Sequence, residues 1–184
     1  MRNFIKYFAS ATLLVILVSF DNPKGWFIAG DKPGNYELSL ALKEGINNGN
    51  CATIKSVAKK INGYGTIIQS SSPEEFFGKR IKMTGFIKTK LVDNWAGLFL
   101  RADVGSITAS LDNMEERPIK GTTDWKKYEI VIDIPANATQ IAYGAILFGT
   151  GQVWLDNISF EVVDKKTPVT SSIFPEPLNL NFEH

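Results

Sequence analysis

Gly149-Thr150-Gly151-Gln152-Val153-Trp154-Leu155-Asp156-Asn157-Ile158-Ser159-Phe160 is the stretch of this sequence that decides the fold. A glycine-rich turn leads into a strand whose apolar residues form two pairs, Val153 with Leu155 and Ile158 with Phe160. The Asp156-Asn157 pair interrupts the alternation, so we expect a β-bulge there that keeps both pairs on one face. A short strand of this kind is typical of the closing edge of a β-sandwich, and it predicts that architecture.

Short strands separated by turn residues account for most of the remaining chain. We expect them at residues 36–40, 51–57, 64–69, 80–89, 96–102, 106–111, 127–134, 140–148 and 152–162. Val92-Asp93-Asn94 and Pro135-Ala136-Asn137 have turn composition, and Asn62-Gly63 predicts a hairpin between the strands on either side of it. One helical turn is expected within residues 72–78. This pattern predicts an all-β protein, an antiparallel β-sandwich or jelly roll.

The composition is that of an ordinary globular domain of nearly neutral charge. The chain has 184 residues, of which 44% are hydrophobic and 21% are charged, and its formal net charge is +1. This length suffices for one domain with its own core and for tails. A net charge this small favours neither nucleic acid nor an acidic partner, so we expect no nucleic-acid partner.

Cysteine and histidine are too scarce for several kinds of site. Cys51 is the only cysteine, so no internal disulfide can form, and its apolar neighbours indicate a small core residue. The only histidine is His184, the last residue, which excludes a serine or cysteine triad and a histidine metal site within the domain. Glu115 and Glu116 are adjacent in one polar loop and do not supply the opposed carboxylates of a glycosidase. We therefore expect no catalytic activity.

The two ends of the chain differ in composition from its middle. Arg2 and Lys6 precede a short apolar run, the pattern of a secretory signal peptide, with an uncleaved membrane anchor or a buried first strand as alternatives. Residues 1–20 are thus predicted to be a signal peptide or membrane anchor, and residues 21–163 the β-sandwich domain. Residues 164–184 have linker composition, with a candidate edge strand near the end. We expect a secreted or cell-surface protein that contacts a membrane only if the first segment is uncleaved.

A resemblance to a known family rests on five stretches: Gly25-Trp26, Gly78-Lys79-Arg80-Ile81, Phe86-Ile87-Lys88-Thr89, Thr122-Thr123-Asp124-Trp125-Lys126-Lys127-Tyr128 and Trp154-Leu155-Asp156-Asn157-Ile158-Ser159-Phe160. They resemble the galactose-binding-like jelly rolls, especially carbohydrate-binding modules of the cellulose- and xylan-binding kind. The resemblance covers most of residues 25–163 and implies an antiparallel β-sandwich. Similar domains also occur beside bacterial transcriptional regulators and glycoside hydrolases, so the resemblance supports the fold better than the function.

The same resemblance implies a structural calcium ion at Asp156. In many relatives the shell is completed from the first loop, where Asp31 and Glu37 are the candidates in this sequence. The alternative is that Asp156 caps local backbone N–H groups, and the sequence leaves both interpretations open. Trp125 opens a strand at a turn, where we interpret it as a structural side chain that covers the end of the core.

A sugar-binding surface needs flat aromatic side chains for the apolar faces of sugar rings, and amide or charged groups for the hydroxyls. The candidates are Trp95, Phe99, Arg101, Asn113, Gln140 and Trp154. Alternation within residues 95–103 places the leucines on one face of a strand and Phe99 and Arg101 on the other, and Trp154 lies opposite its apolar neighbours in the same way. The alternative is that residues 76–77 or a loop cover this face, which would then be an ordinary buried surface. We expect instead that it binds a ligand, with Trp95 at its rim.

These features predict a non-catalytic module of an exported protein that binds a carbohydrate or a related polar ligand, with a glycan or polysaccharide as partner. The alternative is a structural or ligand-sensing accessory domain, such as those attached to bacterial transcriptional regulators. A binding module leaves its aromatic face open with a polar rim, whereas an interaction domain covers that face or makes it broadly apolar.

Overall fold

The structure is a computed structural model and describes residues 22–170. The expected signal peptide or anchor at residues 1–20 and the strand-like end of the tail lie outside the described residues. Within the described range, no helix is long and apolar enough to cross a membrane.

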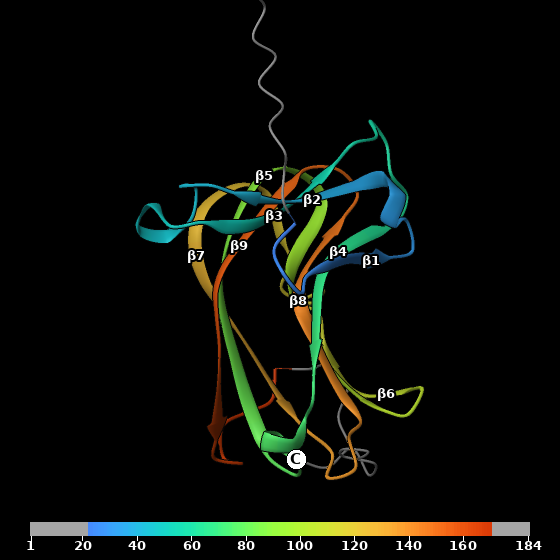
Figure 1. Cartoon of the computed structure of the whole chain (residues 1–184), viewed down its shortest axis with the longest axis vertical. Coiled ribbons are helices and arrows are strands. Elements are labelled where there is room, and N and C mark those ends of the chain that lie inside the picture. The colour runs from blue at the N-terminus through green and yellow to red at the C-terminus, as the bar shows by residue number, and fades with distance from the viewer. Residues whose placement is uncertain (1–21, 171–184) are drawn as a thin grey trace, which may run out of the picture.

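In this part of the chain nine strands form one antiparallel sheet that folds over on itself (Figure 1). They are β1 (Phe27–Gly30), β2 (Tyr36–Ala41), β3 (Cys51–Ser56), β4 (Tyr64–Ser71), β5 (Arg80–Val104), β6 (Ile107–Asp112), β7 (Ile119–Asp133), β8 (Gln140–Phe148) and β9 (Gln152–Val163). The order is β1-β4-β8-β5-β9-β3-β2, and β6 and β7 both pair with β5. The predicted all-β antiparallel sandwich is confirmed.

The long strand β5 belongs to both layers of the sandwich. Its first half pairs with β9 and β7, and its second half pairs with β8 and β6, so it passes from one layer to the other (Figure 1). The prediction of two strands at 80–89 and 96–102, separated by a turn, is therefore wrong. Leu91 has a left-handed φ of 52°, and the register with β7 shifts on both sides of Val92. The turn-forming residues bend one strand without ending it.

The strand β9 carries the stretch quoted at the outset, and it lies inside the sheet. It pairs with β5 on one side and with β3 on the other, so the expectation of a closing edge strand is wrong. The expected bulge is present: Asn157 has a φ of 50°, and the register with β5 shifts between Thr84 and Phe86. As a result, the apolar pairs before and after the bulge contact the same core.

Asn62-Gly63 forms a turn, with a φ of 144° at Gly63, but not the predicted hairpin. The strand before it, β3, pairs with β2 and β9, whereas β4 after it pairs with β1 and β8. The chain therefore changes layers at this turn. A turn motif specifies a local bend, while the choice of partner strand depends on which apolar face must meet the core.

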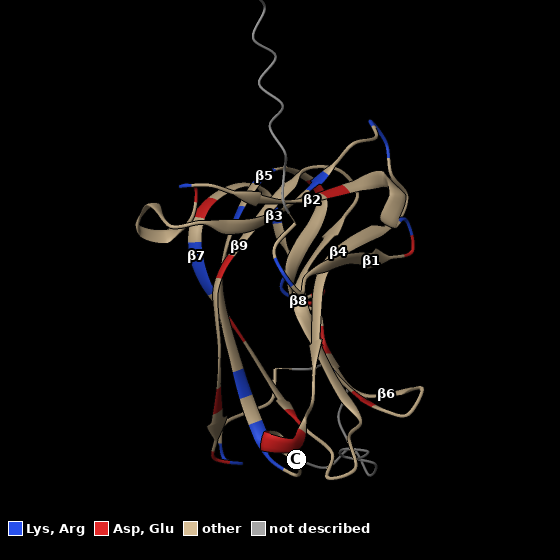
Figure 2. Ribbon diagram, in the orientation of Figure 1, with Lys and Arg blue, Asp and Glu red and all other residues tan. Residues whose placement is uncertain are grey.

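The main core lies between the two layers. Its largest fully buried side chains are all isoleucine, leucine or methionine: Ile54, Ile67, Ile81, Met83, Ile87, Leu98, Leu100, Met114, Ile130, Ile132, Ile134 and Ile141. The expected helical turn is a 3-10 helix, η3 (Glu74–Phe76), and two more such turns are η1 (Pro33–Asn35) and η2 (Ile46–Asn48). Charged side chains of both signs are spread over the layers (Figure 2), and over the whole sequence they nearly cancel.

Candidate ligand-binding pocket

A pocket of about 430 Å³ opens on the outer face of the layer that contains β1, β4, β8 and the second half of β5. It is lined by residues of these strands, of β6 and of the loop after β6: Ala29, Gly30, Tyr64, Thr66, Ile68, Trp95, Phe99, Arg101, Thr108, Leu111, Asn113, Glu115, Ile146 and Phe148. Along β4, β5 and β8 the lining residues alternate with residues of the main core, which is why they share the outer face.

Three aromatic side chains stand in a row across this pocket. Phe148 on β8 is directly opposite both Tyr64 on β4 and Trp95 on β5. The ring centroids are 6.1 Å apart for Tyr64 and Phe148, and 6.0 Å apart for Trp95 and Phe148, with interplanar angles of 23° and 17°. Cross-strand aromatic pairs stabilise strand pairing, and here they give the pocket a continuous apolar side.

The floor beside this row is apolar and depends on one glycine. Phe99, Ile68 and Ile146 are buried in a small cluster that is separate from the main core. Gly144 lies opposite Phe99 and has a φ of 154°. A Cβ at Gly144 would lie 1.9 Å from the carbonyl oxygen of Ile67, so only glycine allows β8 to approach β4 this closely.

Arg101 is the cation of the pocket, and an acidic neighbour orients it. Its Nε lies 3.1 Å from Oδ2 of Asp103, whose Oδ1 accepts a hydrogen bond of 3.1 Å from the Thr108 hydroxyl. Nε makes no hydrogen bond within the described residues, because its contact with Asp103 is not aligned for one. Nε is buried, but the two terminal nitrogens of a guanidinium carry four more N–H donors, and the partly exposed Arg101 side chain can offer these to a ligand.

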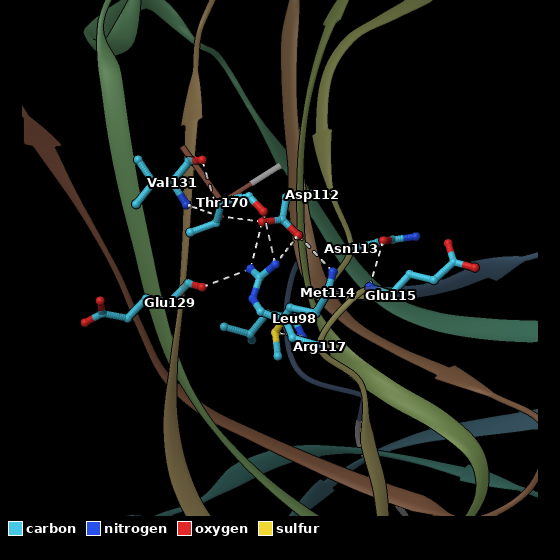
Figure 3. Close-up of polar contacts among 9 residues, drawn as sticks. All are labelled: Leu98, Asp112, Asn113, Met114, Glu115, Arg117, Glu129, Val131 and Thr170. Atoms are coloured by element: carbon cyan, nitrogen blue, oxygen red, sulfur yellow. Dashed lines mark hydrogen bonds and ion pairs between the residues drawn. The ribbon is translucent and has the colours of Figure 1, made fainter. Parts of the chain in front are cut away.

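The loop after β6 adds an amide and a carboxylate. Oδ1 of Asn113 accepts a hydrogen bond of 3.1 Å from the backbone N–H of Glu115, which leaves the Asn113 NH2 as a donor. Figure 3 shows both side chains extending to one side of this loop, opposite Arg117. Arg101 and Glu115 are the charged lining residues, and Asp103 beside Arg101 adds a second negative charge, so the pocket has no excess of positive charge for an anion. The pocket thus suits a polar ligand without net charge.

Four of the five ligand-binding residues predicted from the sequence line this pocket: Trp95, Phe99, Arg101 and Asn113. Trp154 does not, and it packs in a separate cluster with Cys51 and Trp125. Its indole Nε1 donates a hydrogen bond of 2.8 Å to Glu44, and the Lys88 ammonium lies 4.5 Å from its ring centroid. The expectation that Trp154 shares a face with Phe99 and Arg101 is therefore wrong.

The physical reason for this error is that a sandwich has two outer faces. Alternation shows that Trp154 on β9 and Phe99 on β5 both point away from the core, but these residues belong to different layers. Gln140, a further candidate, is not among the lining residues and donates its side-chain N–H to the Ser70 hydroxyl at 2.9 Å.

Asp156 binds backbone amides with both oxygens of its carboxylate. Oδ2 accepts a hydrogen bond from Ile46 and Oδ1 accepts one from Asn157, each at 2.7 Å. Asp31, one of the expected partners, instead accepts a hydrogen bond from the Tyr64 amide. Residues 22–170 contain no cluster of three or more Asp, Glu, His or Cys side chains placed to hold a metal. The geometry fits the capping alternative. The described residues do not assemble the acidic ligands that calcium prefers around Asp156. Calcium binding at Asp156 stays a prediction.

Sequence reasoning did not identify Tyr64, Phe148 and Glu115 as pocket residues. Alternation along residues 64–69 could have placed Tyr64 on the outer face. The row of three rings also depends on the strand order β4-β8-β5, which cannot be predicted from any single stretch of sequence. The polar composition around Glu115 indicates a loop but not which strands lie beside it, and the strands that complete the pocket, β1, β4, β5 and β8, are distant in the chain.

Cys51 is buried, as its neighbours in the sequence indicate. Burial, with a smaller effect of the Asp156 charge, raises the pKa of its thiol to about 11. The thiol is therefore protonated at neutral pH, and a protonated thiol is a poor nucleophile.

No family model matches the chain. A curated relative, the uncharacterized HTH-type transcriptional regulator YbfP of Bacillus subtilis (strain 168), is 38% identical over 168 residues. The match covers 87% of this chain and 57% of the regulator, so the chain spans little more than half of that relative's length.

Solved structures share the fold at low sequence identity. The CBM22-1 xylan-binding domain of Xyn10C from Paenibacillus barcinonensis has a TM-score of 0.55 at 11% identity, over 77% of this chain and 88% of that domain. The fold is a galactose-binding-like jelly roll. The Stig cyclase Fisc of Fischerella sp. TAU also has this jelly roll, with a TM-score of 0.55 at 12% identity, over 79% of this chain and 88% of the cyclase. Because one fold serves a sugar-binding domain and a cyclase, function must be argued from the pocket of this jelly roll itself.

Proposed function

We propose that this jelly roll is a non-catalytic module that binds a carbohydrate in the pocket on its outer face. The observation that carries the proposal is the row of three aromatic rings beside Arg101, Asn113 and Glu115. The rings offer apolar surface to the C–H faces of sugar units, and the polar groups offer donors and acceptors to the hydroxyls. The likeness of the fold to a xylan-binding domain supports the same function.

The expected affinity is moderate. Packing one sugar ring against an aromatic side chain buries roughly 50 Å² of apolar surface, which stabilises the complex by about 1 kcal/mol. Each hydrogen bond to a polar group of the pocket adds about 1 kcal/mol. After the cost of ordering the sugar, the dissociation constant falls in the range of about micromolar to millimolar.

A second candidate function is the sensing of a small soluble ligand by a regulator. The observation that favours it is the match to an HTH-type regulator over 87% of this chain. In that case the same pocket binds a mono- or oligosaccharide, or a similar polar molecule, and not a polymer. Binding of short sugars without retention on insoluble polysaccharide distinguishes this function from the first.

Isothermal titration of the full chain with xylohexaose and with β-1,4-galactotriose, together with pull-down on insoluble xylan, tests the proposal. Arg101→Met should weaken binding several-fold, because it removes hydrogen-bond donors from the pocket. Lys127→Met is the matched control, since Lys127 is an exposed residue of β7 outside the pocket. Absence of binding to every one of these sugars, or equal losses in both variants, would overturn it.

Export stays a proposal that rests on the composition of residues 1–20. Cleavage by a signal peptidase would give a mature protein that starts near Phe20 or Asp21. N-terminal sequencing of protein recovered from its host checks this, and cytosolic protein with Met1 intact contradicts it.

A further inference from the structure

The segment after β9, residues 164–170, returns to the jelly roll and is held there; we call it the strap. Its first attachment is Arg80, whose Nη1 donates hydrogen bonds of 2.6 Å to the carbonyl oxygens of Lys165 and Thr167. Arg80 is itself fixed by Asp133, with hydrogen bonds of 3.0 and 2.8 Å from Nε and Nη2. Linker composition gave no sign of this attachment, because the strap is bound mainly through its backbone.

The second attachment is at Thr170, which pairs with the edge of β7 (Figure 3). Its backbone N–H donates to the Val131 carbonyl at 2.9 Å, and its hydroxyl oxygen accepts from the Val131 N–H at 2.7 Å. The hydroxyl donates a short hydrogen bond to Oδ2 of Asp112, and the Thr170 carbonyl accepts one of 3.2 Å from Arg117. Thr170 therefore contacts both members of a second Arg–Asp pair.

The same carboxylate of Asp112 also fixes the loop after β6. Oδ1 accepts a hydrogen bond of 2.9 Å from the Met114 N–H, and Arg117 donates to the two oxygens at 3.1 and 2.7 Å. The Asp112 side chain is only 4% exposed. A buried carboxylate is costly unless its lone pairs are satisfied, and the Thr170 hydroxyl is one of the four donors that satisfy this one.

This loop forms one wall of the pocket. Met114 seats it against β5: its sulfur accepts a hydrogen bond from the Leu98 N–H, and a Cβ on Gly97 would lie 2.8 Å from the Met114 Cβ. The neighbours of Met114 in the loop, Asn113 and Glu115, line the pocket. The position of these two side chains thus depends on the Asp112 carboxylate and, through it, on Thr170.

We propose that Asp112 and Thr170 are positioning residues for the pocket, and that docking of the strap and binding of the ligand stabilise each other. Coupling between two sites is reciprocal: a strap that holds the loop in its binding shape raises ligand affinity, and a bound ligand must then hold the strap more firmly. The ligand half of this inference rests on the proposed carbohydrate binding. The link from the strap to the loop stands on the contacts alone.

The test uses the full chain with Thr170→Val, which removes the hydroxyl and keeps the shape. Thr167→Val is the matched control, because Thr167 contacts Arg80 through its carbonyl. Thr170→Ser restores the hydroxyl and should behave as the wild type. We expect faster amide hydrogen exchange at residues 113–117 in Thr170→Val than in the other two variants, with xylohexaose affinity about threefold to tenfold lower.

The outcomes separate the two proposals. Unchanged loop exchange in Thr170→Val overturns the positioning role, and so does equal exchange in the Val and Ser variants. Faster loop exchange with unchanged affinity overturns the coupling to the ligand. If the wild type binds no sugar, the proposed function fails while the exchange experiment still decides the strap-to-loop link. If Thr170→Val does not fold, Asp112→Asn, which keeps an acceptor and the size of the side chain, takes its place with the same expectations.

Discussion

Two tryptophans with almost equal exposure illustrate how the surroundings of a residue determine its role. Trp95 is 9% exposed and Trp154 is 7% exposed, so burial alone does not separate them. Trp95 stacks on Phe148 in the wall of the pocket that contains Arg101. Trp154 donates a hydrogen bond to Glu44, lies against the Lys88 ammonium and borders a different hollow on the other layer. The first is placed to contact a ligand in the pocket on β4, β5 and β8, whereas the second lies on the opposite layer, away from that pocket.

We expect Trp154→Ala to destabilise the protein by roughly 3 kcal/mol, because it removes a large buried side chain. The affinity of the folded fraction for xylohexaose should not change. Trp95→Ala should lower that affinity several-fold. Chemical denaturation and calorimetric titration of both variants check this, and a Trp154→Ala protein with normal stability and weakened binding would contradict it.

At the scale of elements, two pairs of arginine and aspartate attach the strap to the strands of the sandwich. Asp133 at the end of β7 and Arg80 at the start of β5 are opposite each other in the register, and together they hold the strap. The Arg80 hydrogen bonds are the main cause of the lowered pKa of the Asp133 carboxyl, with a smaller opposing effect of burial. The stability that this ion pair contributes to the fold therefore depends on pH.

Because the folded-state pKa of Asp133 lies below its ordinary value of 3.8, its contribution to stability is fully present above that pH. The contribution is lost as the pH falls below 3.8 toward the folded-state pKa. Asp133→Asn should lower the free energy of unfolding at neutral pH and lose less of it on acidification than the wild type. Urea midpoints measured at neutral pH and near pH 3 check this; parallel pH profiles of the two proteins would contradict it.

At the scale of the whole molecule, residues far apart in the chain fix loops to the sheet. Asp156 on β9 caps the backbone of Ile46 in the loop between β2 and β3. The resemblance predicts calcium at this position, whereas the contacts show a cap that needs no metal. The two interpretations differ in what calcium does to the stability of the whole fold.

If calcium binds at Asp156, the ion stabilises the folded state in proportion to RT ln(1 + [L]/Kd), about 2.7 kcal/mol at a hundredfold excess over Kd. The melting temperature should then be higher in calcium than in chelator, and Asp156→Asn should abolish the difference. Thermal melts of the full chain measure this. Identical curves for the wild type would leave Asp156 as a cap alone.

The sequence by itself determined the elements and their faces. Strand-forming stretches between turn residues identified β4, β8 and β9, and the interrupted alternation at Asp156-Asn157 identified the bulge. The alternation around Phe99 and Arg101 identified an outer aromatic surface. These features follow from local chemistry, since a side-chain period and a turn preference are properties of neighbouring residues.

Only the tertiary structure decided which elements meet. The continuity of β5 across a turn-like stretch, the central place of β9, the separation of Trp154 from Phe99, and the Thr170 contact with Asp112 all depend on pairings between distant segments. Such pairings are selected by burial of the apolar faces of all strands at once and by the hydrogen bonds that a buried charge requires. Neither condition can be read from one segment alone.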